Sequence, residues 1–388
     1  MTVDREVGAS AGTAHAARLD RAAALACAHG LDGLMVGVGS DLRYLTGYAA
    51  LPLERLTMLV VACGRRPALI VPRLEVAAAR AGLRAEVPIE SWDEVDDPHA
   101  LALAQLDPAR LASRPRLAVS DQLWAFHLLR FQAQLATATP TFVALSPVLR
   151  ELRMIKDAGE ITLLRRAAHA ADRVVTALAA GRLVGRTEGD VAREVRERLV
   201  AEGHDDARFA IVASGPNSAS PHHEASDREI RAGEPIVLDI GGTIGGYGSD
   251  ITRTLWVTGG DGANGPDDRY RELYASLQHA QHAATAAVRP GVACEGIDGV
   301  ARRAIAADGY GDSFIHRTGH GIGLDGHEDP YLVAGNSEPL REGMAFSVEP
   351  GIYFEGEYGA RIEDIVVCGE AGPIVLNEAP RDLLVVDG

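Results

Sequence analysis

The first sign of both fold and chemistry lies in the stretch Pro235-Ile236-Val237-Leu238-Asp239-Ile240-Gly241-Gly242-Thr243-Ile244-Gly245-Gly246-Tyr247-Gly248-Ser249-Asp250. Its first six residues predict a strand that buries one carboxylate, Asp239. A buried carboxylate is costly unless it is paired or bound to a cation. The glycines suit a hairpin or bulge that returns Asp250 to the side of Asp239. Taken alone, the two acids can also be an N-cap and a turn residue.

Further acids and histidines follow in apolar or glycine-rich segments. Three histidines lie in His316-Arg317-Thr318-Gly319-His320-Gly321-Ile322-Gly323-Leu324-Asp325-Gly326-His327-Glu328, where glycines allow a rigid wall around a site. The spacing of His320 and His327 is not that of a thermolysin-like helical zinc site. Glu349 ends a strand-like run that begins at Met344. Glu363 lies in another such run. The alternative interpretation of an acid in this run is a salt bridge to Arg361.

Together these segments supply four carboxylates and one imidazole, from Asp239, Asp250, His320, Glu349 and Glu363. An oxygen-rich set with one nitrogen suits Mn²⁺, Co²⁺, Fe²⁺ or Zn²⁺. Four carboxylates nearly neutralise two divalent cations. Acids that bridge the two cations would hold them about 3.5–4 Å apart, and the cations would lower the pKa of a water between them. The set therefore predicts a hydrolase with two metal ions.

The chain around this set predicts two domains. A length of 388 residues exceeds the usual size of one hydrophobic core. Apolar runs at 34–36, 58–61, 68–71 and 117–119 read as strands, and the segments 74–81 and 121–136 between or after them read as helices, which predicts an α/β unit. A long helix to about Ala180 and a second one capped by Thr187 open a different region. We expect domains at 1–152 and 153–388, with residues 1 to about 15 as a frayed leader.

Charge and cysteine usage indicate the surroundings of the protein. Acidic residues number 54 against 38 basic ones, a net charge of -16 that repels nucleic acid and anionic membranes. Cys27, Cys63, Cys294 and Cys368 form no CxxC pair and are expected to be free thiols in a reducing compartment. We find no secretory signal and no apolar run of membrane-spanning length, so we expect a cytoplasmic protein.

At this point the chain resembles a known family, the "pita-bread" metallopeptidases. The segments that match its pattern, with the five ligand positions in order, are Val237-Leu238-Asp239-Ile240-Gly241, His320-Gly321-Ile322-Gly323, Val348-Glu349-Pro350-Gly351 and Arg361-Ile362-Glu363-Asp364. The region ahead of residue 153 is similar to the N-terminal domain of the prolidase, Xaa-Pro aminopeptidase and creatinase branch, which methionine aminopeptidases lack. The resemblance implies an α/β N-terminal domain followed by an α+β pita-bread catalytic domain. It also implies a homodimer that uses two divalent ions, Mn²⁺ foremost, to hydrolyse the bond between any residue and proline in small peptides.

The resemblance also implies roles for residues around the ligands. His222, in Ser214-Gly215-Pro216-Asn217-Ser218-Ala219-Ser220-Pro221-His222-His223, matches the active-site histidine that stabilises charge in the tetrahedral intermediate. His327 matches a second substrate-binding histidine, and Arg361 and Tyr353 match residues beside the metal ligands or the pocket. Glu349 is expected both to bind metal and to carry the proton from the attacking water to the leaving nitrogen.

One departure from the family and several other functions stay open. Many prolidases that cleave only dipeptides have a basic residue directly after the His-Glu-x-Pro segment, where this chain has Tyr331. Longer Xaa-Pro peptides are therefore also expected substrates. The ligands equally suit relatives that cleave dimethylsulfoniopropionate or hydrolyse ectoine derivatives, whereas creatinases and catalytically silent binding relatives lack the full ligand set.

Overall fold

The structure is a computed structural model that describes the backbone of residues 3–388 and the side chains from Thr13 onward. The chain divides into two compact units, Met1–Arg153 and Met154–Gly388. Among the described residues, no helix has the length and apolar character that a membrane span requires.

The first unit is built on a six-stranded sheet in the order β4-β3-β2-β1-β5-β6. Its strands are β1 (Gly33–Gly37), β2 (Met58–Val61), β3 (Ala68–Pro72), β4 (Ile89–Trp92), β5 (Arg116–Val119) and β6 (Thr141–Ala144). β1 is antiparallel to β2 and parallel to β5, so the sheet is mixed. The predicted strands and helices of this α/β unit are present.

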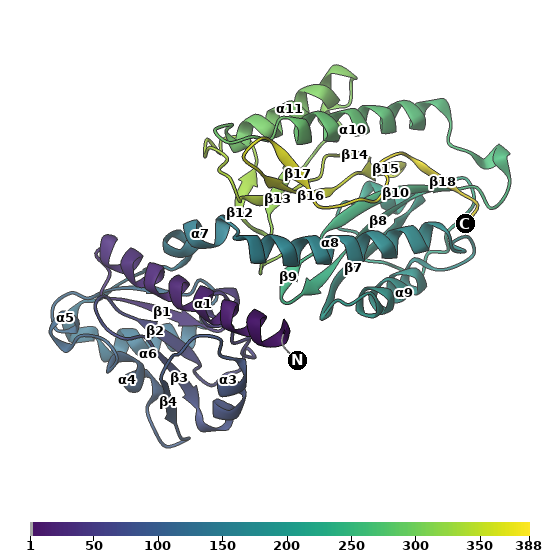
Figure 1. Ribbon diagram of the computed structural model, residues 1–388. Helices are drawn as coiled ribbons and strands as arrows, with labels where there is room; N and C mark the ends of the chain where they lie inside the picture. The colour runs from purple at the N-terminus through teal and green to yellow at the C-terminus, as the bar shows by residue number, and fades with distance from the viewer. Residues whose placement is uncertain (1–2) are drawn as a thin grey trace. The chain divides into compact units, whose positions relative to one another are not determined.

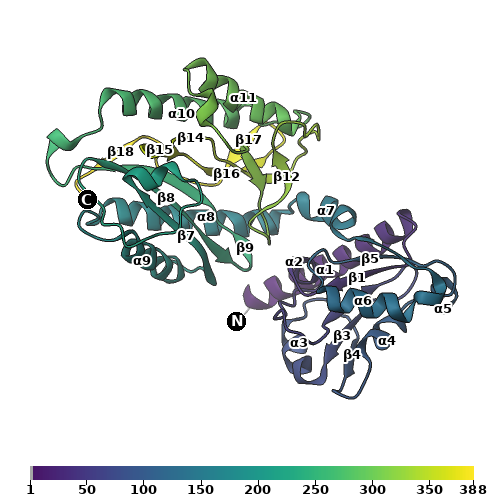
Figure 2. The same ribbon diagram turned by 180° about the vertical axis from the view of Figure 1, so that it is seen from behind.

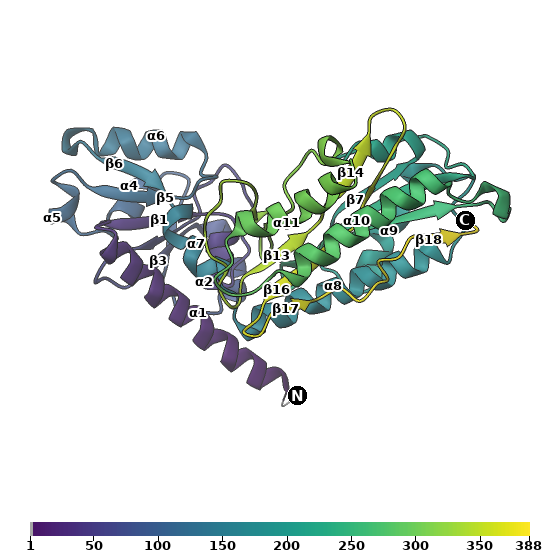
Figure 3. The same ribbon diagram turned by 90° about the horizontal axis from the view of Figure 1, so that it is seen from above.

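Helices cover both faces of this sheet. They are α1 (Val3–Ala28), α2 (Ser40–Thr46), η1 (Arg73–Glu75), α3 (Val76–Gly82), α4 (Pro98–Leu103), α5 (Pro108–Leu111), α6 (Ala125–Gln134), η2 (Ala136–Ala138) and α7 (Ser146–Met154), the last of which ends in the second unit. Helix α1 lies on one face of the sheet, and α4 and α6 lie on the other (Figures 2 and 3). Met35, Trp92 and Phe131 belong to the core between the sheet and α4 and α6.

Two sequence predictions in this unit are wrong. Helix α1 begins at Val3, so the described part of the predicted leader is helical, in keeping with the high helix propensity of its alanines. Cys27 and Cys63 form a disulfide with a Cα–Cα distance of 5.3 Å. Cys27 lies near the end of α1 and Cys63 just after β2, two elements that pack together. Cys294 and Cys368 are thiols outside any disulfide, as predicted, and both are buried.

The second unit contains two larger sheets and a hairpin. One sheet has the order β18-β10-β8-β7 with β9 paired to β8, the other has the order β12-β11-β13-β16-β17, and β14 pairs with β15. The strands are β7 (Asp206–Ser214), β8 (Glu234–Ile244), β9 (Tyr247–Gly248), β10 (Ile251–Val257), β11 (Gly319–Gly321), β12 (Glu328–Leu332), β13 (Ala345–Val348), β14 (Gly351–Phe354), β15 (Tyr358–Arg361), β16 (Asp364–Cys368), β17 (Pro373–Val375) and β18 (Leu384–Val386).

Four long helices enclose these strands. They are α8 (Ala158–Ala179), α9 (Glu188–Ala201), α10 (Asp268–Ala286) and α11 (Cys294–Ala307), with short turns η3 (Gly215–Ala219), η4 (Gly262–Asn264) and η5 (Gly311–Ser313). Helices α8 and α9 lie on one side of the strands, and α10 and α11 lie on the other (Figure 1). Asp157 and Glu160 form a capping box at the start of α8, and Thr187 caps α9 as predicted. This is the α+β pita-bread arrangement.

Candidate active site

The glycine-rich hairpin brings Asp250 to Asp239. Strands β8 and β10 are antiparallel, with Asp239 opposite Thr252 and Asp250 directly before the first residue of β10. Gly245 and Gly246 make the turn with φ angles of 60° and 89°, a region that favours glycine. The two carboxylates are buried and point into one cluster.

The second sheet supplies His320 and Glu349. His320 is the middle residue of β11, and Glu349 follows β13. Gly319 packs directly on the carbonyl of Ser347, where any larger side chain would overlap it. The Ser347 hydroxyl accepts from the His320 amide at 3.0 Å and donates to Oε1 of Glu349 at 3.0 Å. One hydroxyl therefore orients both residues.

Glu363 joins the two sheets. It lies between β15 and β16, and its amide donates to the carbonyl of Thr252 at 3.1 Å. The Thr252 hydroxyl in turn donates to Oε2 of Glu363 at 2.7 Å. Thr252 lies opposite Asp239 on β10, so this contact holds Glu363 beside the aspartate pair.

The five predicted ligands converge into groups that could hold metal ions. Three overlapping groups have ligand atoms within 4.8 Å of one another: Asp239, Asp250 and Glu363; His320, Glu349 and Glu363; and Asp250, His320 and His327. Among the described side chains, Oδ1 of Asp239 and Oε1 of Glu363 are buried without a hydrogen-bond partner. Such atoms are free to coordinate a cation, and acids shared between groups suit two ions.

The electrostatics of the cluster point the same way. Burial, and then the charges of neighbouring carboxylates, raise the pKa of Asp250 and of Glu363 well above the ordinary values. Burial also raises the pKa of Asp239, with Glu349 adding to it and Arg361 opposing it. Buried acids that repel one another in this way need positive charge, which two divalent cations provide. The residues therefore fit a dinuclear centre.

Glu349 differs from the other acids because it faces a histidine. Nε2 of His320 lies 3.1 Å from Oε1 of Glu349 and 3.7 Å from Oδ2 of Asp250. Burial tends to raise the pKa of Glu349, but the hydrogen bond and charge of His320, together with the charges of His316 and Arg361, lower that pKa to about 2. Its side chain is 16% exposed, which leaves it accessible from the site.

Arg361 is the buried cation of the site. Its guanidinium donates to Oδ2 of Asp239 at 2.6 Å, to the Thr252 hydroxyl at 3.0 Å and to the Tyr353 hydroxyl at 2.8 Å. The Tyr353 hydroxyl also lies 2.9 Å from Nε2 of His316. Burial raises the pKa of Tyr353 to about 12, so this phenol stays protonated. Arg361 thus connects a candidate ligand to two further polar side chains.

The predicted substrate-binding histidines lie at the exposed side of the cluster. The rings of His327 and His320 are 3.8 Å apart between centroids. Burial and the neighbouring His320 lower the pKa of His327 to about 4, and His222 is close enough to contribute to this shift. His222 is exposed, whereas Nε2 of its neighbour His223 lies 2.8 Å from the buried carboxylate of Glu188.

A cation also borders the site at Tyr331. The Arg317 guanidinium stacks on the Tyr331 ring, with its central carbon 4.6 Å from the ring centroid. One guanidinium nitrogen lies 3.2 Å from Nδ1 of His327. No carboxylate pairs with Arg317 within the described part of the chain. Arg317 therefore places a positive charge beside Tyr331, the position at which many prolidases have a basic residue.

Sequence reasoning missed several residues that orient the site. Thr252 and Ser347 are ordinary strand residues in the sequence, and only the pairing of distant strands reveals their contacts with Glu363 and Glu349. His316 was noticed as part of a histidine-rich run but given no role. Glu188 directly follows the N-cap Thr187, and an acid in the first turn of a helix is a signal of the helix start, not of a role in a site.

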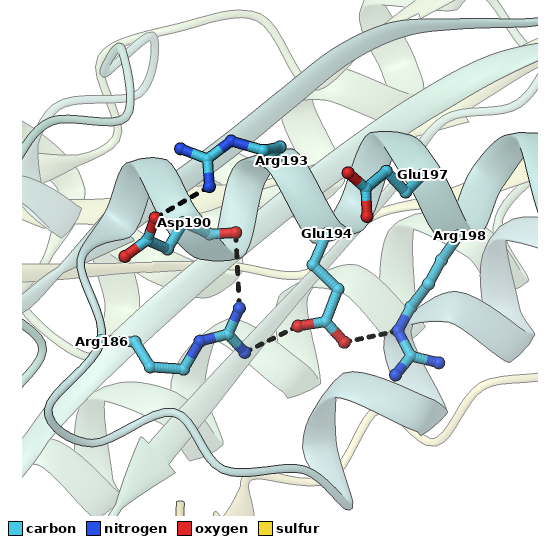
Figure 4. A pocket seen from close by; sticks show the side chains of 6 residues that line it. All are labelled: Arg186, Asp190, Arg193, Glu194, Glu197 and Arg198. Carbon is cyan, nitrogen blue, oxygen red and sulfur yellow. Dashed lines mark hydrogen bonds and ion pairs between the residues drawn. The ribbon is translucent and has the colours of Figure 1, made fainter.

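An open pocket lies away from this cluster, on the surface of α9 and the residues just before it. It is lined by Arg186, which precedes the helix, and by Asp190, Arg193, Glu194, Glu197 and Arg198 of the helix (Figure 4). Glu194 pairs with Arg186 at 2.7 Å and with Arg198 at 2.6 Å, and Arg193 pairs with Asp190 at 2.9 Å. Ion pairs between neighbouring acidic and arginine side chains are typical of a solvated helix surface.

Comparisons with known proteins agree with this geometry. Residues 162–370 match the model of metallopeptidase family M24, and residues 18–155 match that of the creatinase/prolidase N-terminal domain. The chain is 47% identical to a probable dipeptidase, PepE, of Mycobacterium tuberculosis, over 96% of both chains. It is 33% identical to an Xaa-Pro dipeptidase of Pyrococcus furiosus, over 84% of this chain and 88% of that one.

Solved structures give the same result. Dipeptidase PepE from Mycobacterium ulcerans superposes with a TM-score of 0.87 at 45% identity, covering 97% of this chain and 98% of the other. A prolidase from Thermococcus sibiricus does so with a TM-score of 0.87 at 35% identity, covering 95% and 98%. With a converged set of carboxylates and histidines on this fold, the chain belongs to metallopeptidase family M24 and carries the creatinase/prolidase N-terminal domain.

Proposed function

We propose that the protein uses two divalent metal ions to hydrolyse the Xaa-Pro bond in dipeptides and at the N-terminus of longer peptides. The observation that carries this proposal is the convergence of Asp239, Asp250, His320, Glu349 and Glu363 into overlapping groups with shared acids. The names of similar proteins, dipeptidase and Xaa-Pro dipeptidase, supply the substrate class. We assign Mn²⁺ as the first candidate metal because the donors are mostly oxygen with one imidazole; Co²⁺, Fe²⁺ and Zn²⁺ share this preference.

The proposed roles rest on the resemblance to the family, and the positions of the side chains support them. When bound, the cations would polarise the substrate carbonyl and lower the pKa of the attacking water. Glu349 takes the proton from this water and returns it to the leaving proline nitrogen. His222 and His327 contact the substrate on the exposed side and stabilise charge on the tetrahedral intermediate. Arg361 holds Asp239 and Tyr353 in place through the hydrogen bonds described above.

Three further properties belong to the proposal. Residues 1–152 and 153–388 form its N-terminal and catalytic domains. The protein acts as a homodimer on small peptides, which light scattering tests, since a mass of one chain would contradict it. Its compartment is the cytoplasm, where the Cys27–Cys63 disulfide would be unusual. Fractionation of the native cell tests this, and recovery of the protein outside the cytoplasm would contradict it.

Substitution of the ligands tests the assignment of the site. We expect Glu349→Gln and His320→Ala to abolish Xaa-Pro hydrolysis while circular dichroism shows a retained fold. Glu357→Gln is the matched control, because Glu357 is an exposed acid of the same unit whose ion-pair partner among the described residues is Arg269. Full activity in either ligand variant would remove the assigned residues from the reaction.

A further inference from the structure

Glu188 is a buried carboxylate outside the metal cluster with an unusual number of donors. It is the first residue of α9 and is fully buried. It accepts from the amide of Ser214 at 2.8 Å and its hydroxyl at 2.7 Å, and from the amide of Ser226 at 3.1 Å and its hydroxyl at 2.6 Å. Nδ2 of Asn217 and Nε2 of His223 donate to it at 3.0 Å and 2.8 Å.

These donors all come from one segment, residues 214–226, which follows β7 and contains His222. Backbone bonds join the same segment to the start of α9: the amide of Glu188 donates to Arg228 at 3.0 Å, and that of Gly189 donates to Ser226 at 2.9 Å. Burial raises the pKa of Glu188, but the donors from Ser226, His223 and Ser214 outweigh it and lower that pKa to about 2. Glu188 is thus an anionic anchor for the segment.

The segment is also anchored at the other side of His222. The Arg361 guanidinium donates to the carbonyl of Pro221 at 3.3 Å. The Ser218 hydroxyl accepts from the amide of Gly359 on β15 at 2.9 Å. His222 therefore lies between a residue tied to Arg361 and a residue tied to Glu188, while its own ring is exposed. Two anchors on adjacent residues fix the backbone from which this ring projects.

We infer that Glu188 is a positioning residue that holds His222 in its working place through His223 and the 214–226 segment. The inference rests on the proposed function, because it assigns Glu188 to the same reaction. Misplacing a group that contacts the transition state by about 1 Å can lower a rate about 100-fold. Loss of the anchor should therefore lower kcat and leave KM and the metal content unchanged, since none of the residues that donate to Glu188 in the described part of the chain is a candidate metal ligand.

Glu188→Gln is the main variant. It keeps the shape of the side chain but replaces one acceptor oxygen with an NH2 group, which is a donor. In one orientation of the amide this NH2 group faces the donors of Ser214 and Asn217, and in the other it faces the donors of Ser226 and His223. Glu194→Gln is the matched control on the same helix, since Glu194 forms ion pairs with Arg186 and Arg198, away from the 214–226 segment (Figure 4). His223→Gln, which retains a donor near Nε2, should keep most of the activity, and His223→Ala should not.

A double-mutant cycle separates positioning from a general structural role. With Mn²⁺-loaded enzyme and Ala-Pro, we expect Glu188→Gln to lower kcat about 10- to 100-fold, but less than about 2-fold in a His222→Ala background, because the effect is routed through His222. An equal fall in both backgrounds, or normal activity of Glu188→Gln, would overturn the inference.

Hydrogen exchange provides a test that needs no activity and no knowledge of the substrate. We expect amides of residues 214–226 to exchange at least about 10-fold faster in Glu188→Gln and in the milder variant Ser226→Ala than in the wild type, as anchored segments open more readily when an anchor is lost. Unchanged exchange in both variants would overturn the inference, whether or not the wild type cleaves Xaa-Pro bonds. A wild type that cleaves no Xaa-Pro bond would count against the proposed function alone.

Discussion

Two adjacent histidines, His222 and His223, have different surroundings. His223 is bound to the buried Glu188, whereas His222 is exposed and close enough to His327 to influence its pKa. The sequence matched His222 to the family's active-site histidine, but adjacent histidines leave room for an error of one position. The contacts explain why only one of the two is free to meet a substrate.

His222→Ala should therefore lower kcat for Ala-Pro about 10²–10³-fold, the cost of removing one contact to the transition state. The metal content, measured by elemental analysis, should stay at the wild-type value. His223→Ala should cost less, since it acts only through the position of its neighbour. A larger loss in His223→Ala than in His222→Ala would show that the two roles are exchanged.

Arg317 bears on the length of peptide that the site accepts. Its guanidinium is held on the Tyr331 ring and beside His327, without a carboxylate partner within the described residues. A dipeptide carries its terminal carboxylate one residue from the cleaved bond, and a planar guanidinium is a suitable partner for it.

We therefore expect Arg317→Gln to raise KM for Ala-Pro about 10-fold and to change KM for Ala-Pro-amide less than about 2-fold. The amide is the matched substrate without the charge. Tyr331→Phe keeps the ring and is the control for stacking, with KM values near those of the wild type. Equal effects of Arg317→Gln on both substrates would exclude a contact with the carboxylate.

At the scale of elements, the apolar strands and capped helices could be predicted and the long-range pairings could not. Asp239 stands out within β8 because a charge in an apolar run is unusual. The three-residue strand β11 has no such signal, since it is defined by its partners β12 and β13. The Cys27–Cys63 pair was missed because 36 residues separate the two cysteines and only the packing of α1 on β2 brings them together.

The same limit explains which parts of the candidate site were found. The five ligands could be selected because they are acids or histidines in apolar or glycine-rich segments and because the family pattern orders them. Thr252, Ser347 and Glu188 could not, because their function depends on which distant residue each hydroxyl or carboxylate meets.

The start of α9 gives a prediction for stability. The pKa of Glu188 falls from an ordinary 4.5 in the unfolded chain to about 2 in the fold. Its contribution to stability is therefore present above pH 4.5 and is lost as the pH falls towards 2. The charged or titratable groups that face it are Arg228 and His223. Between pH 6 and pH 3 the wild type should lose about 2 kcal/mol more than Glu188→Gln.

Urea unfolding at several pH values, followed by circular dichroism, measures this difference. Glu357→Gln serves as the control, because the ion pair of Glu357 with Arg269 is exposed and contributes little. Parallel loss of stability in the wild type and in Glu188→Gln over this interval would show that Glu188 is not held as an anion in the fold.

For the whole molecule, one strongly acidic chain combines an α/β unit with a pita-bread unit in which two sheets meet at a cluster of acids. The net charge of -16 is spread over a protein whose interior also concentrates carboxylates. Cations are the simplest means of stabilising such a cluster. We therefore expect hydrolysis of Xaa-Pro bonds to require the metal ions that this cluster would bind.

The most direct test is the hydrolysis of Ala-Pro, Gly-Pro, Ala-Pro-Ala and Ala-Ala with added Mn²⁺, with added Co²⁺ and with a chelator. We predict cleavage of the Xaa-Pro bonds only, its loss with the chelator and its recovery when metal is restored. A folded, metal-loaded protein that cleaves none of these peptides would contradict the claim and direct the search to a non-peptide substrate.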